Sequence, residues 1–169
     1  MKNFIQMLLL LVFATGFAQE TSSHIDVDDT VAIEMPGDVY VLDTIQNGMK
    51  LLQYRADTNN SIFLIQRVKI TQISEPLPKE RLISVYKGLL AGHAKTLADN
   101  GYEILRTTET EISGQPARRV LYGKNKQPLA EFLFLIKGLF IYTSSYSSEQ
   151  YFDEKVSTAF LAGIKIKPE

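Results

Sequence analysis

The sequence predicts an α+β fold, an antiparallel meander sheet flanked by two main helices in an αβα arrangement. Three observations lead to this prediction. Short apolar runs alternate with turn residues along most of the chain, which is typical of consecutive β-hairpins. One segment, Lys79–Asp99, repeats its apolar residues at helical spacing instead. A later hairpin, 130–148, is apolar on both faces and therefore needs cover on both sides.

The first residues have the composition of a secretory signal peptide. Lys2 precedes an apolar run of about a dozen residues, which is shorter than the roughly 20 residues of a membrane-spanning helix. Gly16-Phe17-Ala18 supplies the small residues for cleavage after Ala18. We therefore expect 1–18 to be a signal peptide; the alternative is an uncleaved helix that anchors the protein.

The rest of the chain has the composition of one domain. The 169 residues are 45% hydrophobic and 22% charged, values of an ordinary globular protein. The polar stretch 19–29 predicts a flexible acidic leader, and 30–169 a single α+β domain. With no second long apolar run, we expect an exported protein, periplasmic or secreted, that has no stable membrane anchor after cleavage.

Charge and cysteine content exclude several classes of function. The formal net charge is −1, which is not the strongly basic balance that neutralises phosphates, so we expect no nucleic-acid partner. The chain has no cysteine, which excludes disulfides, thiolate metal sites, cysteine nucleophiles and a lipoprotein anchor. Stability must therefore come from the packed core.

The first half of the domain is expected to consist of β-strands. The runs that predict them are 30–38, 39–45, 49–56 and 61–70. Asn47-Gly48 supplies the positive φ of a tight hairpin turn between the second and third runs. The first half of the domain is thus predicted to be an antiparallel meander.

A long amphipathic helix follows the meander. Pro78 suits its start, and Asn100-Gly101 suits its end. Gly88 and Gly92 lie one turn apart, which predicts a close approach of this helix to the sheet. The apolar stripe consists of Leu82, Val85, Tyr86, Leu89, His93 and Leu97.

Two more hairpins, a second helix and a short last strand complete the domain. The hairpin strands are 102–112 with 115–123, and 129–136 with 139–147. Ser147 is a candidate N-cap for the second helix, and Gly163 a candidate end. Residues 164–167 predict the last strand.

A two-residue turn at Lys137-Gly138 would place Ile136 opposite Leu139 in the last hairpin. One face then carries Ala130, Phe132, Phe134, Ile136, Leu139, Ile141, Thr143 and Ser145. The other carries Leu129, Glu131, Leu133, Leu135, Phe140, Tyr142, Ser144 and Tyr146. Burying one large apolar side chain stabilises a fold by about 1.5–3 kcal/mol, so both faces need cover.

Two kinds of cover are open for the second face. In the first, the chain covers both faces itself, with two helices or with one helix and the N-terminal segment. In the second, a partner covers part of the second face. In the latter case Tyr142 and Tyr146 are the natural contact residues, because tyrosine buries its ring and keeps a polar tip. They form one candidate binding surface.

Motifs for catalysis are missing from the sequence. The histidines are His24, in the leader, and His93, on the apolar helix stripe, where packing explains it. No G-x-S-x-G elbow, P-loop, H-E-x-x-H or dinucleotide fingerprint occurs. We expect no catalytic residue, metal or cofactor, although a hydrolase that uses carboxylates alone stays open.

The charged residues of the hairpin 102–123 have a structural explanation. With Ser113-Gly114 as a two-residue turn, Glu109 faces Arg118, and a cross-strand ion pair of roughly 0.2–1 kcal/mol accounts for both. Arg118 and Arg119 could alternatively bind an anion or an acidic patch. With Tyr122 they form the second candidate binding surface.

The order of these elements resembles the PsbP-like fold family. The residues that carry the resemblance are "VAIEMPGD" near the start, "ISGQPARRVLY", "LIKGLFIYTSSYS" and the closing "STAFLAGIKI". This family includes the extrinsic photosystem II protein and many small exported bacterial domains. The resemblance implies an αβα fold and a binding or assembly role, and it supplies no catalytic residue. The absence of tryptophan and the acidic leader do not favour a photosynthetic role.

The sequence therefore predicts an exported, non-enzymatic binding or assembly module of the bacterial envelope or the extracellular space. We expect its partner to be another protein or a second copy of the chain. The alternatives are a carrier that holds a small apolar ligand between sheet and helix, and the carboxylate-only hydrolase.

Overall fold

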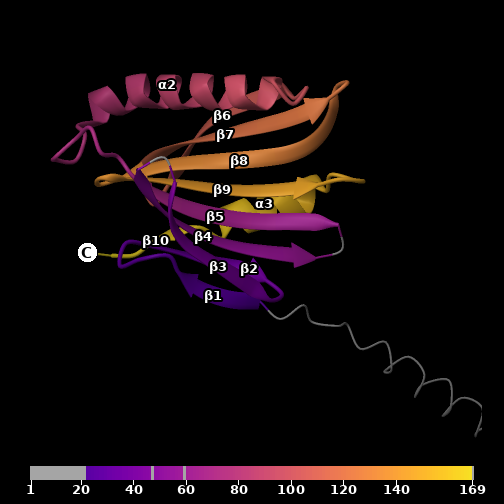
Figure 1. The fold of residues 1–169 in the computed structure, drawn as a ribbon, viewed down its shortest axis with the longest axis horizontal. Helices are drawn as coiled ribbons and strands as arrows, with labels where there is room; N and C mark the ends of the chain where they lie inside the picture. Colours follow the sequence, from indigo (N-terminus) through magenta and orange to yellow (C-terminus); the bar gives the residue numbers. More distant parts are fainter. Residues whose placement is uncertain (1–21, 47, 59, 169) are drawn as a thin grey trace, which may run out of the picture.

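The computed structural model describes residues 22–46, 48–58 and 60–168 (Figure 1). The predicted signal peptide, 1–18, lies outside the described residues. In chain order the elements are β1 (Ser22–Asp26), β2 (Val31–Pro36), β3 (Val39–Gln46), β4 (Met49–Thr58), β5 (Ser61–Lys69), α2 (Lys79–Ala98), β6 (Glu103–Ile112), β7 (Gln115–Lys124), β8 (Gln127–Lys137), β9 (Phe140–Ser148), α3 (Glu154–Ala162) and β10 (Lys165–Ile166).

Two antiparallel sheets make up the β-structure. The larger has seven strands in the order β3-β4-β5-β9-β8-β7-β6, and the smaller has the order β1-β2-β10. In the larger sheet β3–β5 and β6–β9 are each a run of hairpins, and the two runs meet where β5 pairs with β9. The predicted α+β class with antiparallel strands is confirmed.

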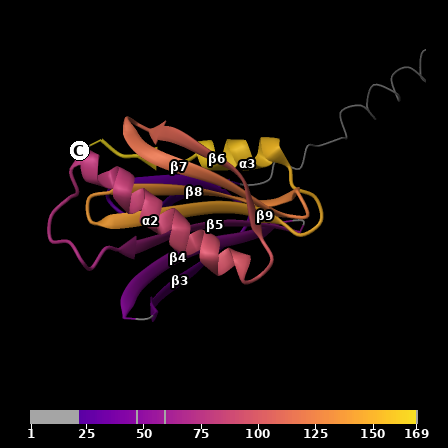
Figure 2. The same cartoon turned by 90° about the horizontal axis from the view of Figure 1, so that it is seen from above.

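The large sheet is the middle layer of three (Figures 1 and 2). Helix α2 crosses one face, where Leu82 and Tyr86 pack into a core with Tyr122, Phe134 and Ile136. Helix α3 and the small sheet cover the other face, and their contributions to that second core include Val31, Ile33, Met35, Phe160 and Leu161. The sheet therefore separates two apolar cores.

Hairpin β8–β9 supplies side chains to both cores, as its two apolar faces predict. Phe134 and Ile136 point into the α2 core, and Leu133 and Leu135 into the opposite core. The observed register pairs Ile136 with Ile141, so the turn lies one residue later than predicted and each cross-strand partner shifts by two positions. A shift of two keeps every side chain on its face, and the predicted face composition is therefore right although the register is wrong.

Residues 22–29 differ from the predicted flexible leader. Ser22–Asp26 is strand β1, which pairs with β2 from Ser22–Pro36 to Asp26–Ala32. Val27 is 2% exposed and belongs to the core beneath α3. The polar composition of this segment arises because β1 is an edge strand whose alternate side chains face solvent.

Helix α2 has the predicted apolar stripe, but its two glycines do not bring it close to the sheet as predicted. A Cβ atom added at Gly88 or Gly92 would meet nothing within 4 Å, and both positions are exposed. The helix packs through Leu82 and Tyr86 instead. Close approach occurs at Gly123, where an added Cβ would overlap the carbonyl group of Gln127 at a break in the β7–β8 register.

Helix α3 begins later than predicted. Asp153 is its N-cap, and the carboxylate accepts hydrogen bonds from the backbone N–H groups of Lys155 (2.8 Å) and Val156 (3.2 Å). Ser147, the predicted cap, lies in β9 opposite Ala130. The strand pairing of β9 continues through Ser148, and this tertiary contact overrides the local capping pattern.

We expect Asp153→Ala to lower the free energy of unfolding by about 1 kcal/mol, because two backbone N–H groups lose their acceptor. Ser147→Ala is the matched control and should have a smaller effect. Denaturant titration of both variants measures the difference. A larger loss in Ser147→Ala would contradict this assignment of the cap.

Candidate functional site

The first predicted binding surface is buried. Tyr142 is 1% and Tyr146 2% exposed, since α3 and the small sheet cover this face of the hairpin. Tyr142 donates a hydrogen bond of 2.6 Å to Asp28, and Tyr146 packs between Phe63 and Phe152. Of the two kinds of cover that the sequence left open, the chain itself covers this face, and Tyr142 and Tyr146 are not exposed to a partner in this fold.

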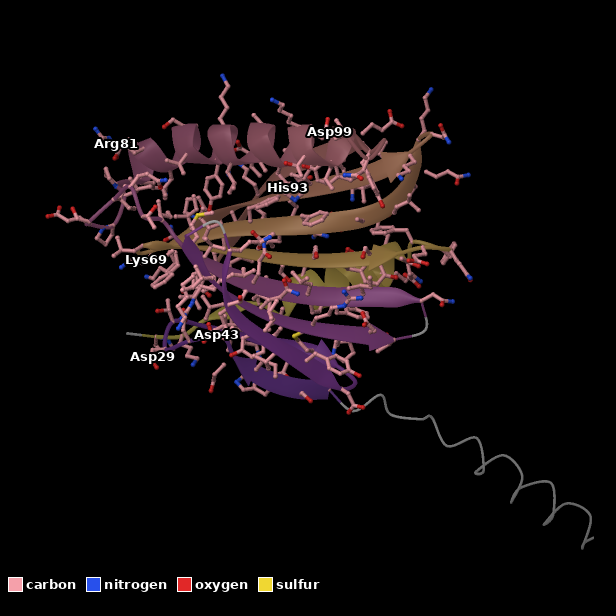
Figure 3. All side chains as sticks on the ribbon, viewed as in Figure 1. Asp29, Asp43, Lys69, Arg81, His93 and Asp99 are labelled. Carbon is pink, nitrogen blue, oxygen red and sulfur yellow. The ribbon has the colours of Figure 1, made fainter. Side chains whose placement is uncertain are left out.

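The second predicted surface is divided between the two faces of the sheet. Arg118 and Tyr122 point toward α2, whereas Arg119 points toward α3. Tyr122 is 1% exposed, and burial raises its pKa to about 12. Its hydroxyl lies 3.0 Å from Nδ1 of His93, whose own pKa is lowered by burial. His93 is thus a packing residue of α2, as predicted (Figure 3).

Arg118 forms the ion pair that the hairpin register predicts. Its guanidinium lies 2.9 Å from the carboxylate of Glu109, directly across the β6–β7 pair. The same guanidinium lies over the ring of Tyr86, 5.1 Å from the ring centroid. The ion pair joins β6 to β7, the contact with Tyr86 ties α2 to the sheet, and the arginine is 9% exposed. An anion-binding role is not needed to explain it.

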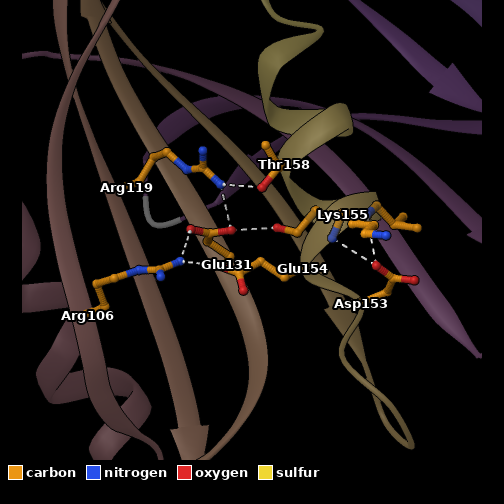
Figure 4. Close-up of polar contacts among 9 residues, drawn as sticks. Arg106, Arg119, Glu131, Asp153, Glu154, Lys155 and Thr158 are labelled. Atoms are coloured by element: carbon orange, nitrogen blue, oxygen red, sulfur yellow. Dashed lines mark hydrogen bonds and ion pairs between the residues drawn. The ribbon is translucent and has the colours of Figure 1, made fainter.

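Arg119 belongs to a polar cluster beneath α3 (Figure 4). Nη2 of Arg119 lies 2.8 Å from Oε2 of Glu131, a residue that is 2% exposed. The same oxygen accepts a hydrogen bond of 2.7 Å from Ser157 of α3. Strand β6 adds a second arginine to the cluster. Nη2 of Arg106 lies 3.7 Å from Oε1 of Glu131 and 2.8 Å from Oε1 of Glu154. The cluster connects β6, β7 and β8 to the helix.

This cluster has the chemistry of a structural anchor. A carboxylate in a core is tolerated when it is paired and hydrogen-bonded, and Glu131 satisfies both conditions. Its oxygens face two arginines and one serine rather than a cavity. Among the described residues, no group of three or more His, Asp or Glu side chains is arranged to hold a metal ion.

A half-buried carboxylate joins the small sheet to the large one. Asp28 accepts hydrogen bonds from Tyr142 (2.6 Å) and Arg67 (2.9 Å) and from the backbone N–H groups of Thr30 and Val31. Burial alone would raise the pKa of Asp28, but these hydrogen bonds outweigh it and hold the pKa below its ordinary value. Asp28 thus fixes the turn between β1 and β2.

The exposed apolar residues lie elsewhere, on hairpin β3–β4. We call them the apolar hairpin surface: Tyr40 (66% exposed), Val41 (58%), Leu42 (48%), Ile45 (74%) and Met49 (38%). The core beneath α2 is built with residues of β7, β8 and β9 and includes no described residue of β3. Tyr40 and Leu42 are exposed on the α2 side of the sheet, and Val41 and Ile45 on the opposite side. Large exposed apolar side chains that gather on one strand mark an interaction site.

Sequence reasoning missed this surface, although a signal for it exists. Val39-Tyr40-Val41-Leu42 is apolar at consecutive positions, as is the hairpin 130–148. For both segments, the sequence therefore requires something to cover the two apolar faces. In β8–β9 the chain covers both faces, and in β3 it leaves both open. A strand at the end of the sheet order has fewer neighbours, and the sequence does not show which strand takes that place.

Comparisons with known proteins do not assign the chain to a family. A scan against protein-family models found no match, and a search of curated proteins found no relative. The resemblance to PsbP-like proteins therefore stays a prediction. Within the part of the chain that the structure describes, no helix is long and apolar enough to cross a membrane.

We expect Asp28→Asn to cost about 1–3 kcal/mol at neutral pH, because Arg67 and Tyr142 lose a charged acceptor. Since its pKa is lowered in the folded state, Asp28 stabilises the fold above the ordinary value of 3.8, and this contribution is lost as the pH falls through the lowered pKa. Denaturation between pH 2 and 7 should therefore be less pH-dependent in the variant.

Asp57→Asn is the control for this measurement. Asp57 is an exposed carboxylate that pairs with Arg55 on β4, outside both cores. Its substitution should leave stability at neutral pH and the acid dependence close to those of the unsubstituted protein. An acid dependence that is unchanged in Asp28→Asn would contradict the role given to Asp28.

Proposed function

We propose that the protein is an exported, non-enzymatic binding module that recognises another protein through the apolar hairpin surface. One observation carries the proposal: Tyr40, Val41 and Ile45 stand in solvent on an edge strand whose two faces are uncovered. Exposing such side chains forgoes about 1.5–3 kcal/mol each. Tyrosine is one of the residues that most often anchor a protein interface, and the buried centre of an interface is apolar.

The surroundings of the patch support a protein partner. On the α2 side, Arg55 of β4 lies between Tyr40 and the half-buried Leu64 of β5, so charged and apolar groups alternate around the surface. Gln53 and Gln66 pair with each other on the same face and can hydrogen-bond to a partner. The predicted signal peptide and the resemblance to small exported domains support a place in the bacterial envelope or outside the cell.

The other functions receive less support from the geometry. For an apolar ligand between sheet and helix, the space is already filled by Tyr86, Tyr122 and Phe134, each 1% exposed. The cleft at the start of α2 is about 290 Å³, at the small end for ligand sites, and Glu109 and Arg118 line it. For a carboxylate-only hydrolase, the buried Glu131 and the half-buried Asp28 already have arginine partners.

A photo-crosslinking amino acid at position 40 tests the proposal in the native host. We expect a covalent product with one defined protein other than this chain, identified by mass spectrometry. Tyr151 is the matched control, because it is a tyrosine of similar exposure (76%) that lies beyond the end of β9. Position 151 should give no such product. Crosslinks from position 40 to this chain alone would contradict the proposal.

Binding of the purified partner then measures the contribution of the same side chain. We expect Tyr40→Ala to raise the dissociation constant at least tenfold, because a tyrosine anchor contributes about 1.4 kcal/mol or more. Tyr151→Ala should leave the constant unchanged. Equal affinities for Tyr40→Ala and the unsubstituted protein would place the binding surface elsewhere.

A further inference from the structure

The two edges of the large sheet differ in their protection against pairing. Edge β6 carries Glu103, Arg106, Glu109 and Glu111, and its register is broken between Ile104 and Arg106. Charges and bulges of this kind prevent another strand from adding to an edge. Proteins without such protection at an edge expose a template for strand addition.

Edge β3 has a single charge and no bulge. Its eight residues, VYVLDTIQ, include no Lys, Arg or Pro, and Asp43 is the sole charged residue. Its register with β4 runs without a shift from Val39–Ala56 to Gln46–Met49. Where β6 is built against pairing, β3 is a regular strand with apolar side chains on both faces.

The hairpin geometry shows which backbone groups of β3 are free. Gln46 and Met49 close the hairpin, and the closing pair of a two-residue loop is hydrogen-bonded. Residues 40, 42 and 44 therefore bond to β4, and residues 39, 41, 43 and 45 direct their N–H and C=O groups outward. A partner strand must match these four outward positions.

We propose that β3 pairs antiparallel with β3 of a second copy of this chain, about a two-fold axis at Leu42. In this register Leu42 lies opposite Leu42 of the second copy. Tyr40 lies opposite Thr44, an aromatic and β-branched pair of the kind that stabilises antiparallel sheets. Val39 lies opposite Ile45, and Val41 opposite Asp43, so the outward backbone groups pair with one another.

The chemistry of β3 favours a copy of itself as the occupant. The strand needs a partner with few charges and with apolar side chains on both faces, and β3, whose one charged residue is Asp43, has this composition. The register sets Asp43 against Val41, so no two like charges lie opposite each other. Among the described strands, the other edges fit less well: β6 is charged, β1 carries His24 and Asp26, and β10 has two residues.

Symmetry leads to the same occupant. A β3–β6 contact between copies would be heterologous and would repeat without closing, and the charges of β6 oppose it. The β3–β3 contact uses the same surface of both copies and closes as a dimer. It would join two seven-stranded sheets into one and bring the two apolar hairpin surfaces side by side. This inference does not depend on the proposed protein partner.

Charged substitutions of Leu42, the residue on the proposed two-fold axis, test the dimer in the mature chain. The unsubstituted protein is expected at twice the chain mass in sedimentation and native mass spectrometry at micromolar concentration. Leu42→Lys and Leu42→Glu each place like charges opposite one another, so each alone should dissociate at least tenfold more readily. An equal mixture of the two should recover the dimer, because an ammonium group then faces a carboxylate across the axis. Leu42 is 48% exposed, so both variants should fold.

Cysteine crosslinking tests the register independently, since the chain has no cysteine of its own. In a non-hydrogen-bonded pair the Cα atoms lie about 4.5 Å apart, within disulfide range. Leu42→Cys should therefore form a disulfide-linked dimer on mild oxidation. Ile45→Cys, on the same strand and more exposed, is the control, because the two cysteines would lie about 20 Å apart along the paired strands.

The outcomes separate the two proposals. A monomeric mass for the unsubstituted chain up to high micromolar concentration would overturn the dimer, and so would dimers of Leu42→Lys as stable as the unsubstituted one. Crosslinking at position 45 in preference to position 42 would overturn the register. None of these results bears on crosslinks from position 40 to a different protein, on which the proposed function depends.

Discussion

The fold depends on hairpin β8–β9, whose two faces are both apolar. A strand pair of this kind cannot lie at a surface, because each exposed face would forgo the burial of several large side chains. Its place is therefore central in the sheet, with β5 on one side and β7 on the other. Helix α2 then covers one face, and α3 with the small sheet covers the second (Figure 1). The three-layer architecture follows from this requirement.

Buried polar groups determine how the layers are aligned. Glu131 binds Arg119 and Ser157, which positions α3 on the sheet (Figure 4). Asp28 binds Tyr142 and Arg67, and its carbonyl oxygen accepts a 2.6 Å hydrogen bond from Lys167 near the end of the chain. Apolar packing has little directional preference, whereas these contacts have defined geometry. The residues predicted to bind a partner thus serve mainly to hold the layers together.

The function that the geometry favours arises from an asymmetry between the ends of the sheet. One edge is charged and bulged, and the other is regular, apolar and open on both faces. Natural sheets protect their edges, and this unprotected edge with its exposed apolar side chains is the observation on which both proposals rest. Both proposals, the binding of another protein and the pairing with a second copy, place the contact on β3 of this one hairpin.

The sequence by itself determined the class of fold, the order of the elements, the faces of β8–β9 and the Glu109–Arg118 pair. These features depend on periodicity and turn residues, which act between near neighbours. Tertiary structure decided that β1 belongs to the domain, that Tyr142 and Tyr146 are buried, and that β3 is the open edge. Exposure of a strand depends on which distant segment packs over it, and two apolar strands such as β3 and β9 look alike until their neighbours are known.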